Sequence, residues 1–439
     1  MKLQLALPRV MKTYGVGYSG IVPPLNLIAL ATYIRKKLQK SGIVIEILDG
    51  DILTQKRLEN QLDGDFVGVH TNFGNYLNAL KIAKRAKKKG AKVIFGGPYS
   101  SALAEVILKK HKYVDYIIRG DGEKALEQII LGKPLRTIKN LVFRDEKGNI
   151  VFNKVEELDI NKMPSPDYSF LDLRAYFKRS QRSSKTKYKE LPIYGGKGCF
   201  WRSIKGCLFC ALPYKSYRMK SPRKVWKEIK DAEKAGATLV WNTLDDFTSD
   251  INWIREFRKL KPKNSPPLFI YSRANNITKE MARLLSDLNC ICVFIGIESG
   301  NNKCLNALRK GFTVNHAIEA VRNLSEYGIE VHPSFVLGAP GETKESVNDT
   351  LDLLKKILEF KNIREVEADI MRPLPGSPAY TLLKNKLKDK YKDIDFIHMD
   401  PLRRDWVKNF CNVDFKYLVS ALKKIQKLGD IPFLPRNYT

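Results

Sequence analysis

The sequence predicts an α/β protein in which a doubly wound parallel sheet is followed by a partial (β/α) barrel and a small helical C-terminal region. Short apolar runs alternate with helical patterns over residues 1–130 and again from residue 191, as in parallel sheets covered by helices. A chain of 439 residues with 44% hydrophobic content can form roughly two or three domains with cores. We expect domains at 1–135, 191–385 and 386–439, with a hairpin and linker at 136–190.

Five short apolar segments in the N-terminal part are expected to form one parallel sheet. They are Leu3–Leu7, Val44–Leu48, Phe66–His70, Lys92–Phe95 and Tyr116–Ile118. A helix is expected over Leu25–Ser41, with Gly42 as its C-terminal stop. Loops rich in Gly, Asn, Asp or Pro follow the last three strands. Ligands of such sheets bind at the carboxyl ends of the strands, so we expect these loops to line one site.

The segment 136–190 has a different pattern. Residues 140–154 contain two short apolar runs around the turn residues 145–149, which predicts a β-hairpin. The proline-containing stretch Met163–Asp167 and the polar run Lys178–Lys189 are interpreted as a linker.

Strand and helix patterns then alternate again, which favours a barrel or partial barrel with its functional residues at the carboxyl ends of the strands. The expected strands are Pro192–Tyr194, Thr238–Asn242, Leu268–Tyr271, Ile291–Ile297, Glu330–Leu337 and Glu365–Met371. A helix is expected to end at Ala235. From about residue 386 the chain is Lys-rich and helical, with a proline-containing tail.

Composition limits the location and the partners. No apolar stretch approaches the roughly 20 residues of a membrane span, and residues 1–10 are too short for the apolar region of a signal peptide, so we expect a cytoplasmic protein. The net charge of +30 attracts phosphate-bearing partners such as nucleic acid or lipid headgroups. Basic residues recur in helical segments such as 81–92 and 220–234, however, which favours solvated helix faces.

Three of the seven cysteines, Cys199, Cys207 and Cys210, are spaced C-x7-C-x2-C in the loop after a strand. Three thiolates leave one iron of a 4Fe-4S cluster open to a small chelating ligand. Structural zinc is the alternative, but closed zinc sites take four ligands and no His lies nearby in the sequence. The spacing favours iron-sulfur and leaves zinc open. Cys290 and Cys292 lie in an apolar strand and are expected in the core.

The stretch GGKGCFWRSIKGCLFC (195–210) resembles the cluster loop of radical S-adenosylmethionine (SAM) enzymes, although the usual pattern is C-x3-C-x2-C. Other segments resemble motifs at the barrel strands of that family. They are Asp245–Thr248, Ser272-Arg273 with Asn276–Thr278, Gly296–Gly300 with Lys310–Thr313, and Phe335–Thr343.

The resemblance implies a 4Fe-4S cluster on the three cysteines, with its open iron binding the amino and carboxylate groups of SAM. An electron from a donor such as ferredoxin or flavodoxin would then release a 5′-deoxyadenosyl radical, which takes a hydrogen atom from an unactivated carbon. The implied SAM contacts are Phe209, Asp245, Asp246, Ser272, Arg273 and Glu298. Carboxylates accept from amino and hydroxyl groups and Arg pairs a carboxylate. Internal salt bridges are the alternative role for the charged residues.

Residues 1–135 resemble the cobalamin-binding domain that precedes many radical SAM barrels. The similarity is carried by Pro23–Leu25, Leu48-Asp49, Val93–Pro98, Val114–Tyr116 and Arg119–Leu126. It implies cobalamin contacts at Thr71, Asn72, Gly96, Gly97, Pro98, Gly120, Asp121, Gly122 and Glu123. The D-x-H-x-x-G string that supplies a His to cobalt in other cobalamin proteins does not occur, and His70 is interpreted as a strand-end residue. Family members often bind cobalamin without this ligand.

Together the two resemblances imply methyl transfer to an unactivated carbon through methylcobalamin and a 5′-deoxyadenosyl radical. Two alternatives stay open: a radical rearrangement, cyclisation or coupling without methyl transfer, and a polyanion-binding protein with a structural cluster. The substrate stays unknown, and a lipid, peptide, nucleic acid or metabolite would fit. The basic charge favours an anionic substrate or peripheral contact with an anionic membrane.

Overall fold

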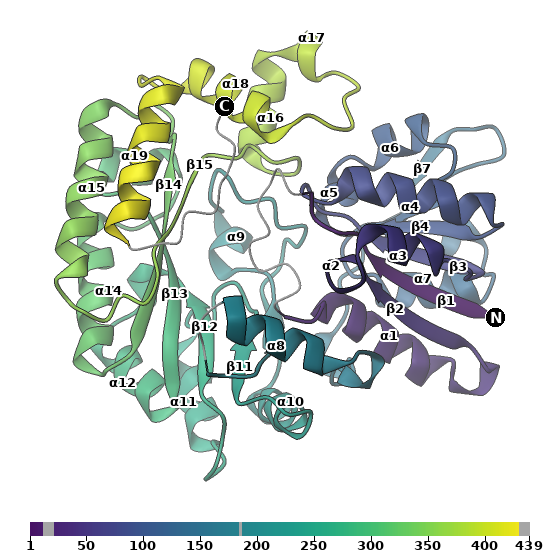
Figure 1. The fold of residues 1–439 in the computed structure, drawn as a ribbon, viewed down its shortest axis with the longest axis horizontal. Coiled ribbons are helices and arrows are strands. Elements are labelled where there is room, and N and C mark those ends of the chain that lie inside the picture. Colours follow the sequence, from purple (N-terminus) through teal and green to yellow (C-terminus); the bar gives the residue numbers. More distant parts are fainter. Residues whose placement is uncertain (12–21, 184–186, 430–439) are drawn as a thin grey trace. The chain divides into compact units, whose positions relative to one another are not determined.

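The computed structural model describes residues 1–11, 22–183 and 187–429 (Figure 1). The chain forms two compact units. The first contains Met1–Leu191, Ala211–Tyr214 and Tyr391–Phe396. The second contains Pro192–Cys210, Lys215–Lys390 and the described residues from Ile397 onward. A short segment from the C-terminal region therefore groups with the N-terminal unit.

The first unit is built on a seven-stranded sheet of order β2-β1-β3-β4-β5-β6-β7. The first five strands are parallel: β1 (Lys2–Leu7), β2 (Val44–Asp49), β3 (Phe66–His70), β4 (Lys92–Gly96) and β5 (Tyr116–Ile118). The predicted hairpin is present as β6 (Leu141–Arg144) and β7 (Ile150–Phe152), and it continues the sheet antiparallel to β5. The five predicted strands are confirmed to within one residue.

Helices cover this sheet (Figure 1). They are α1 (Leu25–Lys37), α2 (Gly50–Leu53), α3 (Gln55–Asn60), α4 (Tyr76–Lys88), α5 (Pro98–Ala102), α6 (Ala104–Lys110) and α7 (Glu123–Ile130). The unit also contains α8 (Leu173–Ser183). The prediction of one helix to Ser41 is wrong at its end, because α1 stops at Lys37 and a 3-10 turn follows. Gly42 has the left-handed conformation of a stop, with φ 64°. The linker predicted from Lys178 begins inside α8, which is anchored by a hydrogen bond from Tyr176 to Asp49.

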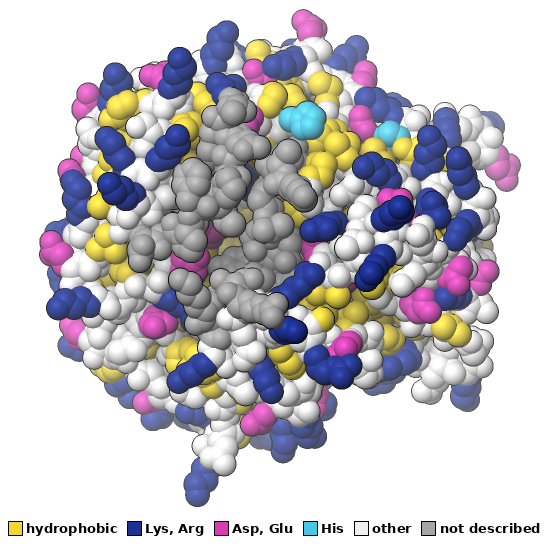
Figure 2. All heavy atoms as spheres, in the orientation of Figure 1, with side chains coloured by type: hydrophobic (Ala, Val, Ile, Leu, Met, Phe, Trp, Pro, Cys, Tyr) yellow, Lys and Arg dark blue, Asp and Glu magenta, His cyan; other side chains and the backbone are white. Residues whose placement is uncertain are grey.

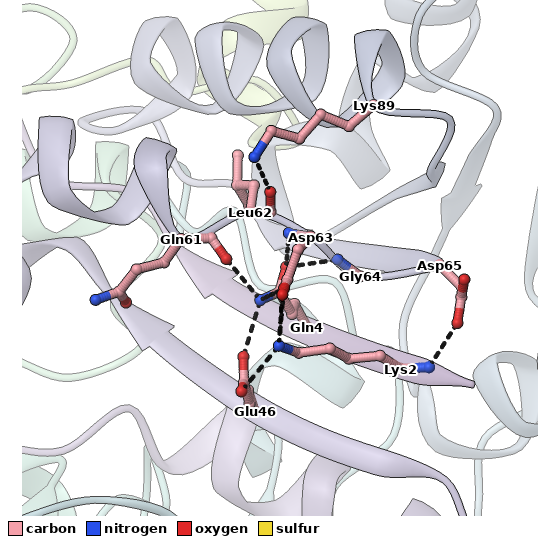
Figure 3. Close-up of polar contacts among 9 residues, drawn as sticks. All are labelled: Lys2, Gln4, Glu46, Gln61, Leu62, Asp63, Gly64, Asp65 and Lys89. Atoms are coloured by element: carbon pink, nitrogen blue, oxygen red, sulfur yellow. Dashed lines mark hydrogen bonds and ion pairs between the residues drawn. The ribbon is translucent and has the colours of Figure 1, made fainter.

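The amino ends of β1, β2 and β3 are joined by a polar cluster around Gln4 (Figure 3). Gln4 is fully buried, and its amide nitrogen lies within 2.9 Å of three acceptors, on Glu46, Gln61 and Asp63. Its amide oxygen accepts from the backbone N–H groups of Asp63 and Gly64. A buried amide is stabilising only when its groups are paired. This network fixes the amino edge of the sheet, opposite the edge where a ligand is expected.

The second unit is a curled half-barrel whose six-stranded sheet has the order β15-β14-β13-β12-β11-β8. Its strands are β8 (Glu190–Ile193), β11 (Leu239–Asn242), β12 (Leu268–Ser272), β13 (Cys290–Glu298), β14 (Glu330–Leu337) and β15 (Glu367–Ile370). The predicted strands are confirmed to within two residues at each end. The two short antiparallel strands β9 (Gly196–Lys197) and β10 (Arg218–Met219), which flank the cysteine loop, were not predicted.

Helices lie along the outer side of the half-barrel (Figure 1). They are α10 (Pro222–Lys234), α11 (Ile251–Lys259), α12 (Lys279–Asp287), α14 (Val314–Glu326) and α15 (Lys344–Leu358). The short helix α13 (Asn302–Ala307) follows β13. The C-terminal region is helical as predicted, with α16 (Pro378–Lys386), α17 (Lys388–Tyr391), α18 (Met399–Phe410) and α19 (Phe415–Leu428). The proline-containing tail beyond residue 429 lies outside the described residues.

Composition left two points for the structure: whether the basic residues form one patch, and whether any helix could span a membrane. On the face drawn in Figure 2, Lys and Arg side chains are spread over the described part instead of gathering in one patch. This distribution is typical of solvated helix faces. Among the described helices, none combines the length and apolar character that crossing a bilayer demands.

Candidate functional site

The cysteine loop is held in place by backbone constraints at both ends. Gly198 has φ 87°, and a Cβ there would lie 2.3 Å from the carbonyl oxygen of Ser216, so only glycine fits. Cys199 then caps the short helix α9 (Phe200–Ile204). Further along, the backbone N–H of Leu208 donates to the carbonyl of Leu308 at 3.0 Å. These contacts attach the loop to the end of α13 and fix where the three cysteines lie.

Cys199, Cys207 and Cys210 are all half-buried, and none of them is in a disulfide. Burial raises the pKa of the Cys199 thiol to about 11, a shift that binding to a metal would reverse because coordinated thiols are deprotonated. Among the described residues, no three His, Cys, Asp or Glu side chains converge on one point suited to a single ion. Three thiolates occupy three corners of a 4Fe-4S cluster and leave the fourth iron open, so the three cysteines of the loop are a donor set that fits such a cluster.

Two carboxylates follow β11 and differ in environment. Asp246 is fully buried, and it accepts a hydrogen bond from Asn276 at 3.0 Å through Oδ1. Its Oδ2 atom is buried without a hydrogen-bond partner, which is the condition of an acceptor waiting for a ligand. Burial raises the pKa of Asp246 to about 6, against the opposing effect of Arg273. Asp245 differs from Asp246 in that its side chain is exposed to solvent.

Ser272 is the last residue of β12 and Arg273 follows it, and both are buried. The Ser272 hydroxyl lies 2.5 Å from the Thr248 hydroxyl and donates to the backbone carbonyl of Arg273, so its bonds are used within the protein. Arg273 donates to the backbone carbonyl of Lys310, and its guanidinium carbon lies 4.8 Å from the centre of the Trp201 ring. The guanidinium is therefore held in one position by groups that do not neutralise its charge.

Glu298 ends β13 in the left-handed conformation, with φ 68°. Its carboxylate receives a hydrogen bond of 2.9 Å from the ammonium group of Lys310. The same ammonium nitrogen lies 5.7 Å from the ring centre of Phe209 and 5.3 Å from that of Phe312. The predicted residues Phe209, Arg273 and Glu298 are thus brought together through Lys310.

Sequence reasoning did not include Lys310 and Trp201 among the site residues. Lys310 stands in a segment that resembles the family, but its pairing with Glu298 depends on how the chain folds. Trp201 packs against Gly311, where a Cβ would lie 2.4 Å from the indole ring. Gly311, directly after Lys310, is the feature of the sequence that could have indicated this contact.

In the first unit, the loops after β3 and β4 are tied together at the carboxyl edge of the sheet. The Thr71 hydroxyl donates to the carbonyl of Gly96 at 2.9 Å and accepts from the N–H of Ser100. Gly97 has φ 98°, and a Cβ there would lie 2.4 Å from the carbonyl oxygen of Thr71, whereas a Cβ at Gly96 would meet nothing within 4 Å. Asn72 is the next residue in the loop after Thr71, and Pro98 is the first residue of α5. Open space therefore lies beside Gly96.

His70 is the last residue of β3. Its Nδ1 atom lies 2.8 Å from the amide nitrogen of Asn26, and burial lowers its pKa to about 4, so the ring is neutral at pH 7. The imidazole is thereby held beside the sheet as a strand-end residue.

The loop of Gly120, Asp121, Gly122 and Glu123 follows β5. Asp121 is buried and accepts a hydrogen bond of 2.9 Å from the backbone N–H of Leu158, and Glu123 is buried at the start of α7. Gly120 has φ 75°, and the nearest atom to a Cβ there would be 3.9 Å away. The backbone at Gly120 is therefore more open to a ligand than the carboxylate of Asp121.

Comparison with known proteins matches each unit to a family. The Radical SAM superfamily model matches residues 193–354, and the B12 binding domain model matches residues 11–130. An uncharacterised methyltransferase of Pyrococcus horikoshii is 26% identical over 90% of this chain and 87% of its own length. The bacteriochlorophyllide d C-12(1)-methyltransferase of Chlorobaculum tepidum is 26% identical over 89% of this chain and 81% of its own length.

Solved structures share the fold. The cobalamin-dependent SAM radical enzyme OxsB, with aqua-cobalamin and SAM bound, matches with a TM-score of 0.75 at 18% identity over 96% of this chain. This chain spans 65% of the OxsB chain. The radical SAM methyltransferase TsrM of Kitasatospora setae, with cobalamin and a [4Fe-4S] cluster bound, matches with a TM-score of 0.69 at 20% identity, over 88% of this chain and 78% of its own.

Proposed function

Because this chain belongs to the radical SAM enzymes that carry a B12-binding domain, we propose that it is a methyltransferase acting on an unactivated carbon. The cofactors of such an enzyme are a 4Fe-4S cluster, SAM and cobalamin. Methyl transfer is supported by the names of its relatives, which include two methyltransferases and, at 22% identity over 90% of this chain, the hopanoid C-2 methylase of Rhodopseudomonas palustris. The observation that carries the proposal is a set of buried charged side chains next to the cysteine loop: Asp246, Arg273, Glu298 and Lys310.

The cluster and SAM supply a 5′-deoxyadenosyl radical that removes a hydrogen atom from the substrate, and cobalamin supplies the methyl group. We assign the cluster and SAM to residues 191–385 and cobalamin to residues 1–135. What this chain contributes is binding, orientation and exclusion of water.

For the cluster and SAM, the proposed ligands of iron are Cys199, Cys207 and Cys210. We propose that the guanidinium of Arg273 pairs with the carboxylate of SAM, because an Arg side chain can bind a carboxylate through two parallel hydrogen bonds. The unpartnered Oδ2 of Asp246 is suited to accept from the amino or hydroxyl groups of SAM. We assign a positioning role to Ser272, because its hydroxyl bonds are already used within the protein.

For cobalamin, the fit rests on open backbone at Gly96 and Gly120. The side chains of Thr71 and Asp121 shape these loops through bonds to backbone groups. We propose that cobalamin binds without a histidine from this domain, because the sequence has no D-x-H-x-x-G string and Nδ1 of His70 is engaged with the amide of Asn26.

The decisive experiment supplies SAM labelled in its methyl group to the anaerobically reconstituted protein together with candidate substrates. We expect S-adenosylhomocysteine and 5′-deoxyadenosine to form together, with label in the product. Formation of 5′-deoxyadenosine alone would contradict methyl transfer and favour a rearrangement, cyclisation or coupling.

We also infer a cytoplasmic location, because ligand thiols need a reducing compartment.

A further inference from the structure

The loop between Cys199 and Cys207 contains a helix to which the proposed cofactor contacts assign no role. Seven residues separate the two cysteines, and five of them form α9 (Phe200–Ile204). Cys199 is the N-cap of this helix, so any group that contacts the helix lies close to a proposed ligand of the cluster.

One side of α9 is anchored. The indole N–H of Trp201 donates to the carbonyl of Arg309 at 2.8 Å, and its ring packs against Gly311. The other side is exposed. Phe200 is 47% exposed and Ile204 is 64% exposed, the highest value among the large hydrophobic side chains of the described residues. Residues four apart lie on one face of a helix, so α9 presents an apolar pair to solvent.

The surrounding sequence is strongly basic. Residues 191–227 contain nine Lys and Arg residues and no Asp or Glu. They are Lys197, Arg202, Lys205, Lys215, Arg218, Lys220, Arg223, Lys224 and Lys227. Two of them do not add to the surface charge, because Lys220 is buried against Glu228 and Lys227 pairs with Asp231. Lys205, directly after α9, is exposed, as is Lys215. An apolar pair with basic neighbours complements a partner that is acidic around an apolar contact.

We propose that α9 is the docking surface for a small acidic electron-carrier protein that reduces the cluster. This inference rests on the proposed radical chemistry, which needs one electron from outside the chain for each SAM cleaved. In the encounter the carrier is oxidised by one electron and the cluster is reduced by one, and no atom is transferred. Electron-transfer complexes are transient and bury little surface, so two exposed apolar side chains suffice as their centre. The net charge of +30 would steer an acidic carrier toward the protein.

The test compares two reductants on the same protein. Dithionite is small and needs no docking surface, whereas reduced flavodoxin, regenerated by NADPH and its reductase, must bind. In the double variant Phe200→Ser/Ile204→Ser we expect 5′-deoxyadenosine formation with limiting flavodoxin to fall by about tenfold or more. With dithionite it should stay within about twofold of wild type. Leu382→Ser is the matched control, because Leu382 is 40% exposed on α16, and it should alter neither rate.

A second variant, Lys205→Glu, tests the charge without touching the apolar pair. It should lower the flavodoxin-supported rate and weaken its dependence on salt. Equal losses with both reductants, at wild-type iron content, would overturn the docking role and make α9 part of the reaction site. Unchanged flavodoxin rates in both variants would also overturn it. Wild-type protein that fails to cleave SAM with dithionite would instead contradict the proposed function.

Discussion

The ammonium nitrogen of Lys310 lies 2.9 Å from Oε1 of Glu298, and the two side chains are only 6% and 7% exposed. Burial is the largest influence on the pKa of Lys310 and lowers it, but the charges of Glu298 and Cys207 and the hydrogen bond to Glu298 together outweigh burial, and the net direction is upward. Each charge therefore depends on the other to remain inside the protein. Because Lys310 also contacts Phe209 and Arg273, this pair joins stability to the proposed SAM site.

The first prediction concerns this pair. Lys310→Met should lower the free energy of unfolding by about 3–5 kcal/mol, because the Glu298 carboxylate is left buried without a partner. The double variant with Glu298→Leu should recover much of this loss. Urea unfolding under anaerobic conditions measures both. Lys279→Met is the control, since Lys279 and its partner Glu326 are 70% and 42% exposed, and exposed pairs contribute little. Equal losses at the two sites would contradict the account.

The second prediction separates ligand cysteines from core cysteines. Cys207→Ala should reduce bound iron and acid-labile sulfide severalfold and abolish reductive cleavage of SAM, because three thiolates are needed to hold the cluster. Cys292→Ala should keep iron and sulfide near wild-type levels, since Cys292 is buried in β13 and behaves as a small hydrophobic residue. The assay is iron and sulfide per chain after anaerobic reconstitution. Equal iron loss in both variants would be evidence against the assignment.

The third prediction tests whether the contact between Gly311 and the Trp201 ring, directly after Lys310 in the chain, is needed for SAM binding. Gly311→Ala places a Cβ 2.4 Å from the Trp201 ring at a residue with φ 71°. The indole must move, so we expect weaker SAM binding, by about tenfold, in equilibrium dialysis. Gly328→Ala is the matched control, because Gly328 has φ 66° and nothing within 4 Å of the added Cβ. The control carries only the backbone strain, so SAM affinity should fall in Gly311→Ala alone.

Periodicity and turn residues were enough to predict the strands of both sheets, because apolar runs bounded by Gly, Asn or Pro are local signals. The cysteine loop was found in the same way, from spacing. The contacts of Lys310 were not, because its partner Glu298 comes from another element and only folding brings the two together. The helix α8 at the start of the polar run from Lys178 was not predicted for a similar reason: it is anchored by the long-range hydrogen bond from Tyr176 to Asp49, which the local sequence does not reveal.

A segment of the C-terminal region also escaped prediction. Tyr391–Phe396 groups with the first unit, where Asp395 accepts hydrogen bonds from Tyr76 at 3.0 Å and from His111 at 2.7 Å. Its carboxylate also pairs with Lys110 at 2.9 Å. Burial raises the pKa of Asp395, but the hydrogen bonds from His111, Lys110 and Tyr76 lower it by more than burial raises it. The pKa of Asp395 is therefore far below its ordinary value.

The last prediction follows from that direction. A carboxyl whose pKa is lower in the folded than in the unfolded protein stabilises the fold above the unfolded pKa, near 3.8, and this stabilisation is lost as the pH falls through the folded value. Asp395→Asn should therefore lower the free energy of unfolding by about 2 kcal/mol at pH 7. The gap from wild type should stay constant down to about pH 5 and shrink below about pH 4. Urea titrations across this range measure it. Asp393→Asn, two residues away and exposed, should leave the pH dependence unchanged. A gap that widened on acidification would show that Asp395 is not held as the charged form by these three partners.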